Sequence, residues 1–595
     1  MSAPDERDIR HGRLIPALRY CDQVYVVKAD DGAWVAIMTT GHGTEGDRGQ
    51  HVAVVRSTDQ GMSWSAPLVL EPPDGPEASY AVLLKTPFGR IYAFYNHNTD
   101  RVTEVLRQDG KSFLRVDSLG HYVFRYSDDH GRTWSARRHE VPLRIFASDR
   151  ANPYHGQLLL FWNVGRPCVA GDAVYIPHTK VSAMGEGFYA ASEGTFLRSP
   201  NLLDEADPDK VRFETLPEGD IGLRTPPGGG PISEEQSLVE LSDGSLYCVY
   251  RSIDGWPVCS YSRDGGRSWD PPTYQCYHPG GRRMKHPRAA NFVWKCRNGK
   301  FLYWYHNQGG GPSARQGWDP YSGRNPVWLS CGTEVDSPEG RKLIWSQPEI
   351  LLYDDDPLVR ISYPDLIEDD GRFFVTETQK ATARVHPMDD TFLRDLFKQR
   401  TANRPAADPV FDSEGEAIDG ARAPKLPSLC YADPTYEHRP SAFTRRGFSL
   451  ELILGAATAP GNTTLVSTLL PGGRGFRVSL TADDRLEFFF SDGRFSSLFT
   501  STLTLSANLC HHATLIVDGG PRVVLFLLDG ILDDGGDERQ YGWVAVPPHL
   551  SHANGAETLS VPSDRLQRLR LFDRPLRISE AVANARANRP PSPDQ

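Results

Sequence analysis

Short polar segments recur along the chain, and each carries side chains that could bind sugar hydroxyls or an anion. Amide, imidazole and ammonium groups donate hydrogen bonds to hydroxyls, and a guanidinium holds a carboxylate through two parallel bonds. One such segment alone is more often a solvated loop or a buried histidine, but their recurrence favours a shared ligand site. The segments lie at residues 95–98 (with His97), 163–166 (with Arg166), 178–180, 285–288 (with His286 and Arg288) and 305–308.

A repeated turn motif predicts the elements that position these segments. The pattern Ser-x-Asp-x-Gly-x-(Ser/Thr)-Trp occurs at residues 57–64, 127–134 and 262–269, so successive copies begin 70 and 135 residues apart. The aspartate accepts backbone amides of its own turn, the glycine takes a positive φ, and the tryptophan fills the space beneath the hairpin. One period followed by two indicates a structural repeat with one degenerate copy.

A second series of turns gives the number of repeats. Turn pairs stand at residues 31–32, 88–89, 171–172, 243–244, 298–299 and 370–371, each before an aromatic-rich strand. Six such hairpins indicate six four-stranded sheets packed around a central channel. We therefore predict an all-β protein whose residues 1–385 form a six-bladed β-propeller.

The pattern changes after the sixth hairpin. Residues 386–440 are rich in Pro, Ala and Asp, and are predicted to form a linker that contains a short helix at residues 389–400. Alternation of apolar and polar residues resumes after residue 441 and continues to about residue 590. This region is predicted to be a β-sandwich of the jelly-roll kind.

Composition narrows the partners. The 595 residues carry a net charge of −11 without a basic block, which argues against nucleic acid and anionic membranes, and no apolar run is long enough for a transmembrane helix. The nine scattered cysteines form no CxxC pair, so neither disulfides nor a metal site is expected, and no cofactor is indicated. The polar start shows no signal peptide; we expect a cytoplasmic protein, or a secreted one if this is a mature form. The oligomeric state is left open.

The octamers resemble Asp boxes, and the predicted propeller resembles that of the sialidase (neuraminidase) superfamily. Residues 568–576, near the end of the chain, resemble a strand of concanavalin-A-like (laminin-G type) lectin domains. Together the two resemblances cover most of the chain. Asp boxes specify the fold and not the activity, so the function depends on the site.

The resemblance implies a catalytic set. Sialidases use a tyrosine nucleophile, a glutamate that takes its proton, an aspartate acid/base and three arginines that hold a carboxylate. Tyr363, in Ser-Tyr-Pro-Asp-Leu, matches the nucleophile, and Glu235, in Ser-Glu-Glu-Gln-Ser, matches the glutamate. Arg251 and Arg324 match two of the arginines. A neutral phenol is a poor nucleophile unless a neighbouring base activates it.

Two positions depart from the family pattern. Where the first arginine is expected, the chain has Asp22 and Gln23. Arg166 or Arg288 is the predicted replacement. In the loop expected to carry the acid/base, Asp47 and His51 are both candidates.

Three functions follow as expectations. The first is an exo-acting, sialidase-type glycoside hydrolase on an acidic sugar. The second is a polysaccharide lyase on a uronic-acid-containing glycan, with His51, His97, His286 or Tyr363 as the base. The third is a non-catalytic protein that only binds glycans.

Overall fold

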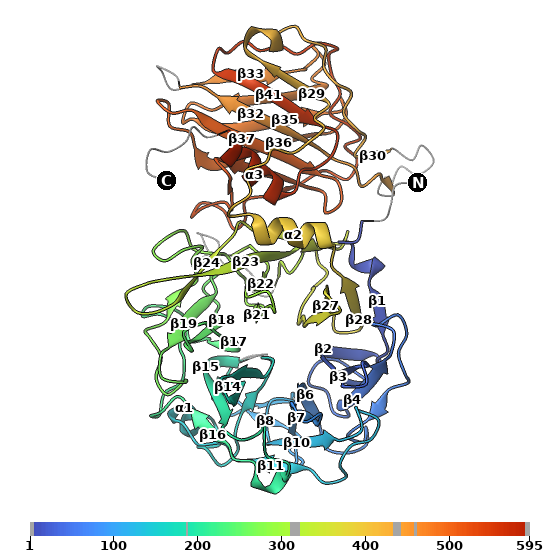
Figure 1. Cartoon of the computed structure of the whole chain (residues 1–595), viewed down its shortest axis with the longest axis vertical. Helices are drawn as coiled ribbons and strands as arrows, with labels where there is room; N and C mark the ends of the chain where they lie inside the picture. The colour runs from blue at the N-terminus through green and yellow to red at the C-terminus, as the bar shows by residue number, and fades with distance from the viewer. Residues whose placement is uncertain (1–4, 186–188, 310–321, 432–441, 457–460, 589–595) are drawn as a thin grey trace.

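The computed structural model describes residues 5–185, 189–309, 322–431, 442–456 and 461–588. Strands far outnumber helices in the described residues, which confirms the predicted all-β class. Two regions lie one above the other in Figure 1: a larger one formed by the first part of the chain, and a smaller one formed by the last part. No helix among the described residues is long and apolar enough to cross a bilayer.

The first region contains six antiparallel sheets that follow one another along the chain and form a ring in Figure 1. The first sheet consists of β2 (Tyr20–Lys28), β3 (Trp34–Gly41), β4 (His51–Ser57) and β5 (Leu68–Val69), and the second of β6 (Ala78–Lys85), β7 (Ile91–His97), β10 (His121–Ser127) and β11 (His139–Val141). The third consists of β12 (Phe161–Trp162), β14 (Ala173–Met184), β15 (Tyr189–Ser199) and β16 (Glu214–Leu216), with β13 (Cys168–Ala170) also paired to β14. A short hairpin, β8 (Val105–Leu106) and β9 (Ser112–Phe113), projects between β7 and β10.

The other three sheets complete the ring. The fourth sheet consists of β17 (Glu234–Glu240), β18 (Leu246–Arg251), β19 (Val258–Ser262) and β20 (Thr273–Tyr274). The fifth consists of β21 (Phe292–Lys295), β22 (Phe301–Tyr305), β23 (Val327–Val335) and β24 (Lys342–Trp345), with β25 (Glu349–Leu352) also paired to β23. The sixth consists of β26 (Leu366–Asp369), β27 (Arg372–Thr378), β28 (Ala383–Pro387) and β1 (Arg13–Ile15). The sixth sheet therefore joins both ends of the region, because β1 pairs antiparallel with β28, for example Ile15 with Ala383.

The three octamers form the hydrogen bonds that their residue types predict. In the first copy the Ser57 hydroxyl donates to Asp59 at 2.8 Å and accepts from the Gly61 amide at 2.8 Å, while the Ser63 amide donates to Asp59 at 2.9 Å. The other copies repeat this arrangement. Each octamer begins at the last residue of the third strand of its sheet; β4, for instance, ends at Ser57.

The last region contains two sheets over one apolar core. The larger sheet has the order β29 (Phe411–Glu414), β41 (Leu566–Phe572), β32 (Phe448–Leu454), β37 (His511–Asp518), β38 (Val523–Leu528) and β39 (Ile531–Leu532), with β40 (Val544–Ala545) beside β38; the smaller one has β33 (Thr463–Ser467), β34 (Gly475–Leu480), β35 (Arg485–Ser491) and β36 (Ser496–Thr504). Both sheets contribute to the same cluster, in which Phe448 packs edge-on against Phe488.

The connecting segment is more ordered than a linker. The helix α2 (Asp390–Lys398) lies within the predicted range, and its N-terminus is capped by Asp389, which accepts the Phe392 amide at 2.6 Å. The strand β29, also in this segment, pairs with β41, so the segment contributes an edge strand to the C-terminal sheet. The other α-helices in the described residues are α1 (Ala147–Ala151) and α3 (Ile578–Ala587). The strand β30 (Cys430–Tyr431), near the end of the connecting segment, pairs with β31 (Ala442–Phe443).

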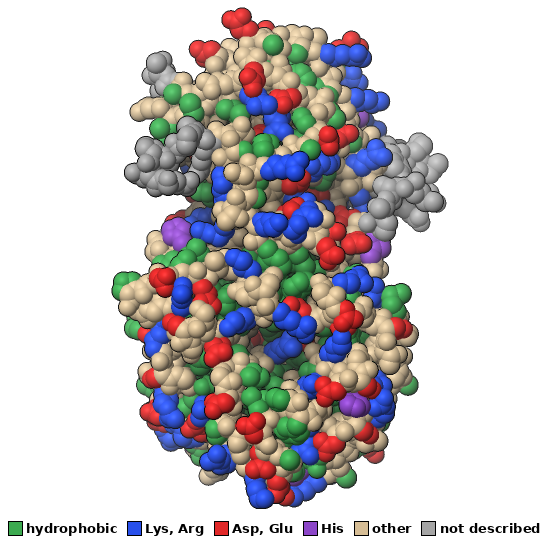
Figure 2. Space-filling model, in the orientation of Figure 1, with side chains coloured by type: hydrophobic (Ala, Val, Ile, Leu, Met, Phe, Trp, Pro, Cys, Tyr) green, Lys and Arg blue, Asp and Glu red, His purple; other side chains and the backbone are tan. Residues whose placement is uncertain are grey.

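Acidic and basic side chains are interspersed over the face of the molecule seen in Figure 2. None of the nine cysteines forms a disulfide. In the described residues no group of three or more His, Cys, Asp or Glu side chains converges on a point where a metal ion could sit.

Candidate functional site

A pocket of about 760 Å³ opens where the innermost strands of the ring begin. Glu235 lies at the start of β17, Tyr80 at the start of β6, and Tyr363 just before β26. The lining residues are Thr44, Glu45, Gly46, Asp47, Tyr80, Ser112, Phe113, Leu114, Arg115, Trp162, Tyr189, Glu235, Arg251, Arg324, Arg360, Tyr363 and Lys380. Thus one pocket brings together Tyr363, Glu235, Arg251, Arg324 and Asp47, which were singled out from the sequence.

Residues near the starts of four inner strands share one backbone conformation, and three of them, Tyr80, Glu235 and Tyr363, line the pocket. Gln23, Tyr80, Glu235 and Tyr363 all have a left-handed φ, between 49° and 58°. Strand pairing is irregular at the first three of these positions, so the side chain leaves the regular alternation of the strand. Left-handed non-glycine residues cost free energy and are concentrated at functional sites. For Glu235 the conformation is held by its amide, which donates to the Thr179 hydroxyl at 2.9 Å.

The tyrosine and the glutamate form a direct pair. The Tyr363 hydroxyl donates to Glu235 Oε1 at 3.1 Å, and Glu235 Oε2 lies 2.9 Å from Arg251 Nη1. Burial raises the pKa of the Glu235 carboxyl, and Arg251 opposes this rise. Burial and the Glu235 charge also raise the pKa of the Tyr363 phenol, while Lys380 and Arg251 oppose the rise. The carboxylate is therefore a stronger base than an exposed glutamate, and it faces the proton that it would have to accept.

The arginines differ in how far their charge is neutralised. Arg251 Nη2 lies 2.8 Å from Glu234 Oε2, and Arg288 Nη2 lies 2.6 Å from Glu234 Oε1. Arg324 instead donates to the Ser362 hydroxyl and to the Arg288 carbonyl, both at 3.0 Å. In the described residues no carboxylate lies within ion-pair distance of Arg324, and its buried Nε has no hydrogen-bond partner.

The buried guanidinium of Arg324 is thus a positive charge without a direct counterion. Burial lowers its pKa, the effect expected when a cation lies in an environment of low polarity. Arg360, an exposed residue, also lines the pocket. A buried, incompletely bonded guanidinium at a pocket wall is suited to bind a carboxylate.

The region that lacks the expected first arginine carries a different cation. Lys380 forms an ion pair with Asp22, and its Nζ lies 3.1 Å from Glu45 Oε2. Glu45 also pairs with Arg115 at 2.8 Å, and both cations keep the pKa of its carboxyl far below the usual range against the effect of burial. Because Glu45 stays ionised, it cannot serve as a general acid. Asp47, on the same loop, is exposed and accepts the Thr44 amide at 2.6 Å.

Four of the predicted residues are buried near the pocket but do not line it. Arg288 binds Glu234, Asp22 binds Lys380, and Gln23 is buried with its Oε1 unpartnered in the described structure. His51 is also buried; its Nδ1 lies 3.0 Å from the Gly49 carbonyl. None of these four lines the pocket.

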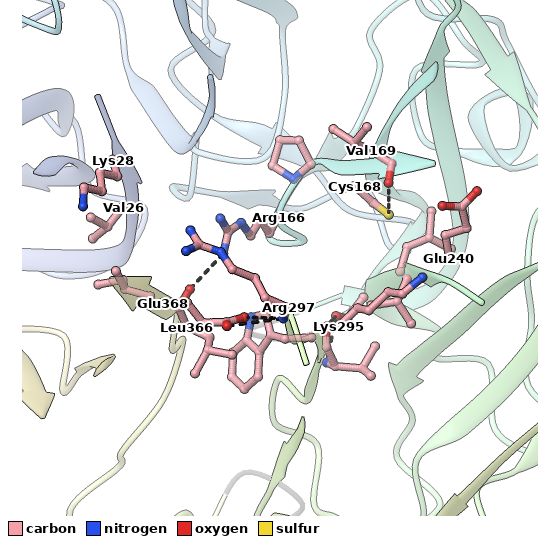
Figure 3. A pocket seen from close by; sticks show the side chains of 17 residues that line it. Val26, Lys28, Arg166, Cys168, Val169, Glu240, Lys295, Arg297, Leu366 and Glu368 are labelled. Atoms are coloured by element: carbon pink, nitrogen blue, oxygen red, sulfur yellow. Dashed lines mark hydrogen bonds between the residues drawn. The ribbon is translucent and has the colours of Figure 1, made fainter. Parts of the chain in front are cut away.

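Two predicted residues lie elsewhere. Arg166 does not replace the missing arginine at this pocket: it lines a second pocket of about 390 Å³, to which β2, β17, β21 and β26 contribute (Figure 3). Its guanidinium donates a hydrogen bond to Asp365 at 3.1 Å. Arg166 lies between β12 and β13, which pair with successive parts of β14, so it stands well past the start of the inner edge of this sheet. His97 ends β7, where it receives a hydrogen bond from Arg138, and burial lowers its pKa to about 4.

The histidines weigh against a histidine base. No histidine lines the pocket in the described part of the chain. His286 is buried, its Nε2 lies 2.7 Å from the Ala289 carbonyl, and burial lowers its pKa to about 3. Of the bases considered for a lyase, only Tyr363 faces the pocket.

Sequence reasoning missed several lining residues. The aromatic wall of Trp162 and Tyr189, stacked with ring centroids 4.4 Å apart, has no local signal, since such residues usually fill a core. Lys380 was missed because both of its carboxylate partners, Asp22 and Glu45, are distant in sequence. Arg115 has a near partner in Asp117, but its contact to Glu45 joins segments that are far apart in the chain. Lys380 lies shortly after β27, the strand that contains Thr376 and Glu377, and its position in a hairpin turn could have drawn attention to it.

The comparisons give one family match and a set of distant structures. Residues 125–136 match the BNR/Asp-box repeat. No curated protein sequence matches the chain. Among solved structures, a point mutant of NanB sialidase from Streptococcus pneumoniae has 12% identity and a TM-score of 0.44, covering 63% of this chain and 70% of that one. The intramolecular trans-sialidase from Ruminococcus gnavus, with oseltamivir carboxylate, has 14% identity and a TM-score of 0.44, covering 65% and 99%.

A third structure extends over more of the chain. The Trypanosoma rangeli sialidase in complex with sialic acid has 13% identity and a TM-score of 0.40, and the match covers 96% of this chain and 93% of that chain. Similarity at this level does not define a reaction.

Proposed function

We propose that this chain is an exo-acting glycoside hydrolase of the sialidase type that acts on an acidic sugar. In this proposal the six sheets are the blades of a β-propeller, and the C-terminal region is a concanavalin-A-like sandwich. The hydrogen bond from the Tyr363 hydroxyl to Glu235 at 3.1 Å carries the proposal, because it pairs a nucleophile with a base inside a pocket. Arg324, beside this pair, has no carboxylate within ion-pair distance among the described residues, and its charge supports an acidic substrate.

The substrate carboxylate lies against Arg324 and Arg251, with Arg360 at the open side. Arg251 is held by Glu234 and Glu235, so it offers less free charge than Arg324. A carboxylate that receives hydrogen bonds from Arg324 completes the bonding of a buried cation, which makes this contact stronger than an exposed ion pair. This contact orients the anomeric carbon towards Tyr363.

The reaction has two displacements. The Tyr363 oxygen attacks the anomeric carbon as its proton passes to Glu235; the bond to the leaving oxygen breaks, and that oxygen takes a proton from Asp47. Water then attacks the same carbon and gives a proton to Asp47, while the tyrosine oxygen leaves and regains its proton from Glu235. Two inversions give net retention, by the tyrosine route that departs from the usual pair of carboxylates.

The C-terminal region would increase the local concentration of substrate. A second glycan-binding module on the same chain makes binding of a polymeric or surface glycan partly intramolecular. The proposed hydrolysis does not depend on this contribution.

Tyr363→Phe tests the proposal directly. The variant keeps the ring but removes the nucleophilic oxygen, so kcat on aryl glycosides of acidic sugars should fall about 10³-fold. Tyr247→Phe is the matched control, because Tyr247 is buried in the fourth sheet and donates to Gln275, away from the pocket. Its kcat should remain close to that of the unmodified protein.

Trapping separates hydrolysis from the alternatives. With a fluorinated analogue of the acidic sugar, mass spectrometry should find a glycosyl adduct on the peptide that contains Tyr363. Full activity of Tyr363→Phe would contradict the role of Tyr363 as the nucleophile. An unsaturated uronate product would favour the lyase, and glycan-array binding without turnover would favour a purely binding protein.

A further inference from the structure

Lys380 is fixed beside the nucleophile by its backbone as well as by its side chain. It has a left-handed φ of 69° in the turn between β27 and β28. Its carbonyl accepts the Cys21 amide at 2.9 Å, which ties this turn to β2 in the neighbouring sheet. Strained backbone conformations are concentrated at functional sites, so this lysine is a candidate for a functional role.

The ammonium group of Lys380 lies over the face of the nucleophilic ring. Its Nζ is 4.5 Å from the ring centroid of Tyr363. Two carboxylates hold it there: Asp22, which is buried, and Glu45, at 3.1 Å. The same group therefore contacts the tyrosine and offsets part of the negative charge of two carboxylates close to it.

The charges around Tyr363 determine the cost of removing its proton. Glu235 and Asp22 oppose formation of a phenoxide, while Lys380 and Arg251 favour it, and Arg324 is also close enough to interact with the phenol. The attraction between an ammonium group and an aromatic ring grows when the ring becomes negatively charged. An interaction that strengthens as the proton leaves stabilises the transition state more than the ground state.

We propose that Lys380 is a positioning residue that stabilises the Tyr363 phenoxide as it forms, and that it shields this phenoxide from Asp22 and Glu45. In the first sheet the chain has a carboxylate where its sialidase resemblance leads one to expect an arginine, and Lys380 converts that negative region into one that tolerates a phenoxide. The proposal rests on the proposed function for its catalytic meaning. The effect of Lys380 on the ionisation of Tyr363 can be measured even if the protein hydrolyses no substrate.

The test measures the ionisation of residue 363 without substrate. A fluorinated tyrosine placed at position 363 of the full chain brings phenol ionisation into a measurable pH range and reports it by ¹⁹F NMR. Lys380→Met should raise the pKa of this residue by about one unit, a tenfold loss in the ionisation constant. Lys380→Arg, which keeps the positive charge, should largely restore the value.

Asp22→Asn gives a prediction of opposite sign and serves if Lys380→Met does not fold. Removing this carboxylate leaves more of the Lys380 charge to act on the ring, so the pKa of the fluorinated residue 363 should fall. An unchanged pKa in Lys380→Met, or a rise in Asp22→Asn, would overturn the proposal.

Kinetics distinguish this role from binding of the substrate carboxylate. In the unlabelled protein Lys380→Met should lower kcat about tenfold with little change in KM, whereas loss of a carboxylate contact would chiefly raise KM. If the chain hydrolyses no acidic glycoside but the NMR shifts appear as stated, the proposed function fails and the Lys380 contact to Tyr363 stands. The reverse result would remove Lys380 from the mechanism and leave Tyr363 and Glu235 in place.

Discussion

Glu77 is a buried carboxyl group just before β6 and close to the acid/base loop. Only 4% of the residue is exposed, and neither carboxyl oxygen meets hydrogen-bond geometry with a partner in the described residues. Burial, reinforced by the charge of Asp117, raises its pKa to about 10, although the Gln50 amide lies near enough to oppose the shift. Glu77 is therefore protonated in the folded protein at neutral pH, whereas it is ionised in the unfolded chain.

This difference makes stability depend on pH. Between the ordinary glutamate pKa and about 10 the folded state binds a proton that the unfolded chain has released, so the free energy of unfolding falls as pH rises through this window. Glu77→Gln removes the titration and should stabilise the protein by about 1–3 kcal/mol at pH 8, with little effect at pH 4. Urea unfolding at the two pH values measures this, and equal effects at both would contradict a protonated Glu77.

At the residue scale, the sequence predicted Tyr363 and Glu235, which stand near the starts of strands, but it did not predict Lys380, whose contacts are with residues distant in the chain. Tyr363 and Glu235 stand in recognisable segments, and both line the pocket. Lys380 depends on Cys21 and Asp22, more than 350 residues away. Arg166 shows the opposite error: its residue type fitted, but the sequence does not show at which end of the inner strands it lies.

The Asp-box turn is the element that repeats most faithfully. In the second copy Asp129 accepts from the Ser127 hydroxyl and the Thr133 amide, both at 2.8 Å, and from the Thr133 hydroxyl at 2.7 Å. These donors lower the pKa of the Asp129 carboxyl against the effect of burial. The turn lies at the end of β10 remote from the strand starts that form the pocket, so it stabilises the sheet without touching the site.

Asp129→Ala should therefore separate stability from activity. Loss of the acceptor for several donors should lower the free energy of unfolding by about 1–3 kcal/mol, while kcat and KM stay unchanged. Asp172→Ala, at an exposed turn, is the control and should change stability by less than about 0.5 kcal/mol. A large loss of activity in folded Asp129→Ala would show that the turn and the pocket are coupled.

Elements were predictable where the signal is local. Glycine and aspartate in a hairpin fix a turn within a few residues, which is why the turn pairs gave six sheets. β1 closes the sixth sheet only because Arg13–Ile15 meets Ala383–Pro387 from the other end of the region, and no local pattern records such a pairing. β29 was similarly hidden inside a stretch whose composition indicates a linker.

At the scale of the whole molecule, the two regions share an apolar contact. One cluster contains Trp345 and Ile350 of the fifth sheet together with Leu525 and Ile578 of the C-terminal region. In Figure 1, α2 lies between the two regions, and Asp395 of this helix pairs with Arg577 at 2.5 Å. Since both sides bury apolar surface here, we expect the regions to unfold together.

Glu349 provides the test of this coupling. Its carboxylate, only 4% exposed, accepts the Ser579 amide at 2.6 Å and the Ile578 amide at 3.1 Å, and so satisfies the first turn of α3 from the fifth sheet. Glu349→Ala leaves two buried donors unpaired and should lower the free energy of unfolding by about 2–3 kcal/mol. If the two regions unfold together, hydrogen exchange should quicken in α3, in β38 and in the slowest-exchanging amides of β6, because all three then share one free energy of unfolding. The exposed control Glu339→Ala should leave exchange in these elements unchanged. Unaltered α3 exchange in Glu349→Ala would mean that the two regions are held together without this contact.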